Sequence, residues 1–211
     1  MFTKNQLKII NLLNTPEKIK KFIDNLKYNE DDWITIDKVL KKKKAACLEA
    51  AILSILILRH HKYEAYLLDL EAVRDEDHVL VVYKEKGKWG SIAKSKYLNL
   101  RHREPIYDSI KELAMSYFEH YFNYYGELSL RRFSKPIPIE PLLKKYDWKS
   151  LKFVDQTAQK LVDAKHESII KNTKKKMPKV SPEKFWSEIQ VLPKNTKIGK
   201  QYEKTKPKKN R

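Results

Sequence analysis

The sequence predicts an α+β protein in which a cysteine-bearing helix packs on an antiparallel sheet, with helical segments before and after it. The segment AACLEAAILSILILRHH, residues 45–61, is almost entirely apolar and long enough for a buried helix. Two shorter segments follow, YEAYLLDL and HVLVVY, and they are rich in the aromatic and branched residues that favour strands. Apolar residues recur at helical spacing on both sides of this region.

The residues before the cysteine helix predict three further helices. Apolar side chains at helical spacing indicate the first, over residues 7–13. Thr15 followed by Pro16 is typical of a helix start, and we expect this second helix to reach about residue 26. Either Thr35 or Asp37 caps a short third helix, which ends in the lysine run that precedes the cysteine helix.

A hairpin follows the first predicted strand. Gly87, within KEKGK, closes a turn between HVLVVY and KWGSIA. Because side chains alternate along a strand, His78, Leu80 and Val82 share one face of the sheet.

The second half of the chain predicts more helix. Aromatic and apolar residues recur at helical spacing over 107–121, so we expect a helix that begins near Pro105. Residues 129–143 contain three prolines and are expected to be extended. A helix is predicted over about 153–170, and Ser181 caps a short one after it.

Length and composition predict one main domain, since domains commonly contain roughly 100–200 residues. We assign it to residues 1–150, with a helical lead (1–43) and a core (44–134). Residues 151–211 are expected to form a helical, Lys-rich extension that is partly disordered. The single cysteine excludes an intramolecular disulfide framework and a cysteine-based zinc cluster. With no apolar span or signal sequence evident, we expect a soluble cytoplasmic protein that does not enter a membrane, and its oligomeric state stays open.

The net charge of +18 is concentrated near the end of the chain. Residues 171–211 contain 14 Lys and Arg against 3 Asp and Glu, a net +11. This tail either attracts polyanions nonspecifically or is simply solvated. Lys outnumbers Arg by 38 to 7, and Arg is the residue suited to bidentate base recognition. With no zinc knuckle, aromatic RNA-binding strand or helix-turn-helix pattern in the sequence, we do not expect sequence-specific nucleic-acid recognition.

Cys47 and His78 are the candidate reactive pair. A thiol at a helix start is placed where the helix dipole favours thiolate, and a nearby imidazole can hold its proton. The structural alternatives are a small buried hydrophobic cysteine and a histidine satisfied at a strand edge. If the pair is reactive, iodoacetamide labels Cys47 rapidly at neutral pH.

The stretch from Ala45 to Ala93 resembles the transglutaminase-like superfamily, part of the papain-like cysteine-enzyme fold. CLEAAILSILILR supplies a Cys at the start of a helix that ends in Leu-Arg, DHVLVVY a His that opens a strand, and KWGSIA the following Trp. From DHVLVVY to about Ser134 the chain also resembles a group of uncharacterised bacterial proteins with this core. The resemblance implies a transglutaminase-like core and a cysteine-dependent acyl transfer or peptidase-like amide hydrolysis on a protein or peptide substrate, with no metal or organic cofactor.

The resemblance also implies the roles of individual residues. Cys47 is the nucleophile and His78 the general base. The superfamily usually has an Asp four residues after the Trp to orient the imidazole, but here that position is Ala93. Ser95, two residues further on, is the best substitute, and Asp75 is a second candidate.

A basic loop follows the hairpin. Lys94, Asn99, Arg101 and Arg103 come just after the strand expected beside His78. They predict a cleft that binds a carboxylate, a phosphate or an acidic peptide, and the alternative is a solvated basic loop. Two functions therefore stay open: a cysteine-dependent enzyme, and an inactive scaffold that binds a protein or polyanion through this loop and the tail.

Overall fold

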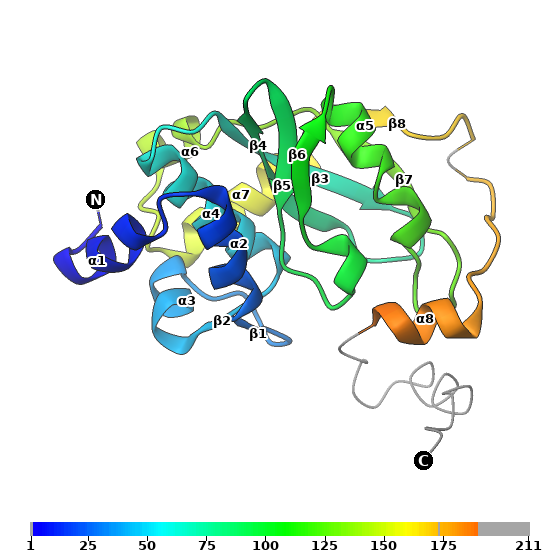
Figure 1. The fold of residues 1–211 in the computed structure, drawn as a ribbon, viewed down its shortest axis with the longest axis horizontal. Coiled ribbons are helices and arrows are strands. Elements are labelled where there is room, and N and C mark those ends of the chain that lie inside the picture. The colour runs from blue at the N-terminus through cyan, green and yellow to red at the C-terminus, as the bar shows by residue number, and fades with distance from the viewer. Residues whose placement is uncertain (1, 173, 190–211) are drawn as a thin grey trace, which may run out of the picture.

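The computed structural model describes residues 2–172 and 174–189, and the expected disorder of the Lys-rich end falls on residues outside this part. A six-stranded antiparallel sheet in the order β6-β5-β4-β3-β7-β8 divides the molecule (Figure 1). Its strands are β3 (Ala65–Ala72), β4 (His78–Glu85), β5 (Lys88–Ile92), β6 (Arg103–Tyr107), β7 (Leu130–Ser134) and β8 (His166–Ser168). The expectation of an α+β fold with an antiparallel sheet is confirmed.

One face of the sheet is covered by α4 (Cys47–His60) and the helices around it. Figure 1 shows this group on one side of the sheet: α1 (Lys4–Leu12), α2 (Pro16–Asp24), α3 (Ile36–Lys42), α6 (Glu140–Lys145) and α7 (Leu151–Val162). Eleven of the fourteen residues of α4 are buried, so this helix has no polar face and must be enclosed. Each fully buried Leu or Ile stabilises the fold by about 1.5–3 kcal/mol.

The opposite face carries a second core rich in aromatic residues. It is covered by α5 (Ile110–Met115), the 3-10 turn η2 (Phe118–His120) and α8 (Pro182–Glu188). A further 3-10 turn, η1 (Leu98–Leu100), lies between β5 and β6. A short parallel pair, β1 (Lys27–Tyr28) with β2 (Lys44–Ala45), fixes the chain just before α4.

The predicted helix starts are confirmed where a side chain caps the helix. Thr15 accepts a hydrogen bond from the Lys18 backbone N–H, and Ser181 accepts one from Lys184. Thr35, rather than Asp37, caps α3. These caps satisfy backbone groups that a helix start leaves unpaired, which explains why the sequence locates them well.

The helix expected from Pro105 is wrong. Residues 103–107 form the edge strand β6, and Pro105 falls where the register between β5 and β6 shifts, an irregularity at which a proline is tolerated. The helix that follows, α5, is short and is capped by Ser109. The aromatic and apolar residues at helical spacing therefore belong to a strand, a short helix and a turn that all contact one core.

Two other expectations change after residue 139. The segment expected to be wholly extended contains the helix α6, in which Pro141 occupies the first turn, where its missing N–H is tolerated. The next helix, α7, ends at Val162 rather than near residue 170, because 166–168 pair with β7 as β8. Phe153, Val154 and Leu161 of α7 lie in the same core as α4, so this helix shares its core with residues before 150.

Gly90 of β5 lies where the backbone of β6 and the ring of Tyr83 approach closely. A Cβ built there lies 2.9 Å from the Pro105 nitrogen and 2.9 Å from the ring of buried Tyr83. We predict that Gly90→Ala lowers the free energy of unfolding by about 2–3 kcal/mol, as overpacking does. Urea denaturation measures the change.

Gly87→Ala is the matched control. Gly87 has φ +81° and open space around it. The substitution therefore destabilises the fold only by placing an alanine in a left-handed backbone conformation, which costs about 1 kcal/mol. If Gly90→Ala were no more destabilising than Gly87→Ala, the close contact between β5 and β6 would be absent.

A candidate thiol site at the start of α4

Buried Glu49 fixes the start of α4, where Cys47 lies. Its Oε2 accepts a hydrogen bond from the Ala46 backbone N–H at 3.0 Å. Its Oε1 accepts from Ile34 N–H at 3.2 Å and from the side-chain amide of Asn29 at 3.0 Å. One carboxylate therefore binds the helix terminus and the preceding loop together.

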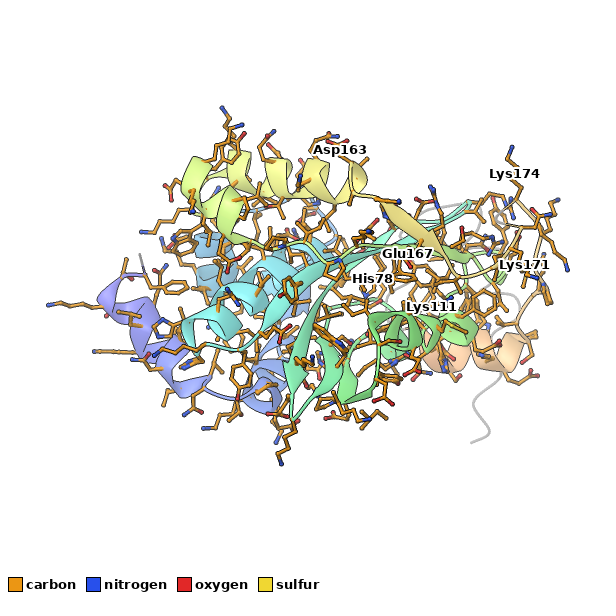
Figure 2. The ribbon with its side chains drawn as sticks, turned by 90° about the horizontal axis from the view of Figure 1, so that it is seen from above. His78, Lys111, Asp163, Glu167, Lys171 and Lys174 are labelled. Atoms are coloured by element: carbon orange, nitrogen blue, oxygen red, sulfur yellow. The ribbon has the colours of Figure 1, made fainter. Side chains whose placement is uncertain are left out.

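His78, the first residue of β4, is held by a backbone carbonyl. Its Nε2 lies 2.9 Å from the Leu100 carbonyl oxygen. Because a carbonyl only accepts, Nε2 carries the proton, and Nδ1 of the neutral ring keeps its lone pair. The ring packs edge-on to Tyr121, with 6.4 Å between ring centroids, and Figure 2 shows His78 well inside the molecule.

Cys47 and His78 line the same cavity of about 40 Å³. This volume holds a few waters, since one water needs roughly 10–15 Å³. The two side chains approach it from different faces of the sheet: α4 packs on the face of Val81, whereas His78 shares a face with Leu80. Within the described part of the chain, no hydrogen bond joins the thiol to the imidazole, so the free protein holds them near one cavity without a direct bond.

Both groups are neutral at pH 7. Desolvation by burial raises the pKa of the Cys47 thiol to about 11, although backbone N–H groups of Val79 and Leu48 oppose the rise. The expectation that the helix terminus favours thiolate is therefore wrong, because desolvation and nearby Glu49 outweigh those N–H groups. Burial also lowers the pKa of His78 to about 4.

The residues expected to orient His78 have other partners. Ser95 lines the cavity, but its hydroxyl accepts from the Tyr97 N–H at 3.1 Å. Asp75 accepts from Ser129 at 2.6 Å, and Asp77 accepts from the Ala72 N–H at 2.8 Å. The expected role of Ser95 is corrected: the Leu100 carbonyl binds the imidazole instead.

The four residues of the predicted basic cleft, Lys94, Asn99, Arg101 and Arg103, line neither this cavity nor the larger groove next to it. Buried Lys94 donates to the Asp24 carbonyl at 2.9 Å, and Arg101 pairs with the Asp24 carboxylate at 3.1 Å.

Arg103 is held in the same way. Its guanidinium donates to the Asn99 carbonyl at 2.9 Å. The same group stacks on Tyr117, with 3.9 Å between the Arg103 Cζ and the ring centroid. These contacts stabilise the loop that presents Leu100 to His78, so the basic residues act on the site through the backbone.

The sequence reasoning missed several residues around the cavity. Tyr28, Lys96, Tyr121 and Tyr124 line it together with the candidate pair. Lys96 donates to Glu76 and to the Tyr124 hydroxyl, each at 3.2 Å. The Glu three residues after Ala46 was a readable capping signal for Glu49, whereas the tyrosines come from segments far apart in the chain and carry no local signal.

A larger groove of about 720 Å³ lies beside the cavity, and Cys47 lines both. The thiol of Cys47 therefore lies beside a space large enough for a molecule bigger than a few waters.

No protein-family model matches the chain, and no curated protein matches it significantly. Among the described residues, no helix combines the length and apolar character needed to cross a membrane.

We predict that His78 stays neutral, with its proton on Nε2, down to about pH 4, because burial opposes its charge. Nitrogen-15 NMR of the imidazole measures both the tautomer and the titration. An ordinary pKa near 6.5 would contradict the burial of the ring, and a proton on Nδ1 would contradict the Leu100 hydrogen bond.

The lowered pKa of His78 also makes the free energy of unfolding depend on pH. Between pH 6.5 and 4 only the unfolded state protonates His78, so its contribution to stability is lost as the pH falls through this range. The raised pKa values of Asp69 and Asp75, each about 6, act in the opposite direction. The difference between wild type and His78→Gln therefore isolates the histidine, and wild type is expected to lose more stability on acidification.

Proposed function

We propose that the protein is a transglutaminase-like, cysteine-dependent acyl-transfer or amide-hydrolysing enzyme that uses Cys47 and His78. One observation carries the proposal: the thiol and the imidazole line one cavity, and the Leu100 carbonyl holds the ring in the tautomer that leaves Nδ1 as a base. The cysteine helix α4 packs on an antiparallel sheet, and His78 opens β4, the second strand after that helix. This arrangement supports a transglutaminase-like core.

The chemistry starts from a neutral pair. As Sγ of Cys47 attacks an amide carbonyl, Nδ1 of His78 takes the thiol proton and then passes it to the departing amine. The C–N bond breaks, and a thioester to Cys47 remains. Water or a second amine then attacks the thioester and gives its proton to Nδ1 of His78. The C–S bond breaks, and the proton passes from Nδ1 to Sγ of Cys47, which restores the thiol.

Leu100 supplies what an acidic residue at position 93 would otherwise supply. Its carbonyl fixes the ring and stabilises a proton on Nε2, although it lacks the full charge of a carboxylate. Catalytic hydrogen bonds are often long in a free enzyme and shorten when substrate binds, so the unbonded thiol and imidazole are compatible with this mechanism.

The alternative is an inactive scaffold with the same fold. The observation that favours it is the pair of pKa shifts, which oppose both thiolate and imidazolium in the resting site. The two functions differ in whether acyl transfer to Cys47 depends on His78.

We predict that p-nitrophenyl acetate acylates Cys47 at pH 7 and that His78→Gln slows this step at least about a hundredfold, the usual contribution of a general base. Gln can still donate to the Leu100 carbonyl but cannot accept the proton. Release of p-nitrophenol and the mass of the acylated protein measure the rate. The rapid iodoacetamide labelling expected from the sequence is corrected: alkylation is expected to be slow at pH 7 and to rise with pH, because burial raises the pKa of the Cys47 thiol to about 11.

Three controls accompany this experiment. Cys47→Ala must abolish acylation, and circular dichroism must show that each variant is folded. His60→Gln changes an exposed histidine at the other end of α4 and must leave the rate unchanged. If His78→Gln reacted as fast as wild type, the enzyme proposal would fail and the inactive scaffold would stand.

A further inference from the structure

The groove beside Cys47 continues into a second hollow. The larger part has a volume of about 720 Å³, the second about 410 Å³, and both are lined by Asp31 and Trp33. The continuous surface begins at the thiol and ends beside Asp155 of α7. Together the two hollows have the volume to hold a short segment of polypeptide.

The charge of this surface is opposite to that of the chain. Five carboxylates line the larger part: Glu30, Asp31, Asp69, Glu76 and Asp77. Asp32 and Asp155 extend the series into the second hollow, and Lys96 is the single basic residue among the described residues that line either part. A concentration of negative charge on a protein of net charge +18 creates a local field that attracts cations.

A buried acceptor at the same surface lacks a donor. Asn29 lines the groove and is 2% exposed, and its amide nitrogen donates to Asp32 and Glu49. Its Oδ1 has no hydrogen-bond partner in the described structure. A buried carbonyl oxygen without a donor costs free energy, and an N–H group of a ligand would satisfy it.

Apolar side chains lie between the carboxylates. Leu48, Val79 and Leu161 line the groove, and Trp33 and Val162 on its rim are 44% and 68% exposed. An indole face binds aliphatic side chains and also attracts ammonium or guanidinium groups. The surface therefore combines apolar contact with negative charge.

We propose that this groove binds a positively charged polypeptide segment, one with lysine or arginine interspersed with apolar residues, and presents it to Cys47. Calling that segment a substrate rests on the proposed function, whereas its binding does not depend on the thiol chemistry. The sign is the reverse of the acidic ligand expected from the basic loop, since that loop lies outside the groove.

Fluorescence anisotropy tests the proposal with two short fluorescein-labelled peptides. One contains lysine, leucine and glycine, and the other has glutamate in place of every lysine. The full-length protein with Cys47→Ala is used, so that binding is measured without any reaction at the thiol. We expect the lysine peptide to bind, the glutamate peptide not to bind, and affinity to fall as salt rises from about 50 to about 300 mM.

The triple variant Glu30→Gln, Asp31→Asn, Asp155→Asn removes three exposed carboxylates from the groove. We expect it to weaken binding of the lysine peptide about tenfold. The matched control Glu17→Gln, Glu64→Gln, Glu119→Gln removes the same charge from exposed positions that line neither hollow, and we expect it to change affinity less than twofold.

Two results would overturn the proposal. Equal weakening by both triple variants would show that the peptide is attracted to the whole molecule and not to the groove. Binding of the glutamate peptide as tightly as the lysine peptide would show that the groove does not select a positively charged ligand. Neither result depends on acylation: if His78→Gln acylates normally but the groove variant loses binding, the enzyme proposal fails while the binding surface stands.

Discussion

The burial of α4 against β3 and β4 is the constraint on which the rest of the structure depends. Eleven of its fourteen residues are buried, so it must be enclosed by the sheet on one side and by helices on the others. Once its axis is fixed, its first residue, Cys47, has to lie at the start of β4. The buried carboxylate of Glu49 then binds the neighbouring loop to the same helix end, and the walls of the cavity and the groove follow from that position.

Enclosure also determines the electrostatics of the site. A half-buried thiol and a buried imidazole are each stabilised in the neutral form. A neutral pair can still transfer an acyl group, provided that the proton moves during the attack and that the imidazole is held in one tautomer. The Leu100 carbonyl meets the second condition, and the basic side chains of the loop stabilise the turn that carries it. The exposed carboxylates along the groove, such as Glu30, Asp31 and Asp155, supply charge for binding rather than for the proton transfer.

The sequence predicted those parts of the structure that local chemistry specifies. Helix starts at Thr15, Thr35 and Ser181, the hairpin at Gly87 and the burial of the cysteine helix each depend on residues within a few positions. The edge strand at Pro105 was misread because tyrosines at helical spacing fit a helix as well as they fit successive elements around one core.

The partner of His78 could not be predicted, because every residue has a carbonyl and the fold alone selects Leu100.

The negative charge of the groove could not be predicted from the sequence for a similar reason. Its carboxylates come from two loops, the strand β3 and α7, and only the folded chain brings them together. The measurement that tests the central claim most directly is a crystal structure of the protein with a peptide aldehyde bound to Cys47. The account predicts that Nδ1 of His78 lies within about 3–4 Å of the sulfur or the adduct oxygen, with Nε2 still donating to Leu100. An imidazole that turns toward Tyr121, with Nδ1 making no approach to the adduct, would contradict it.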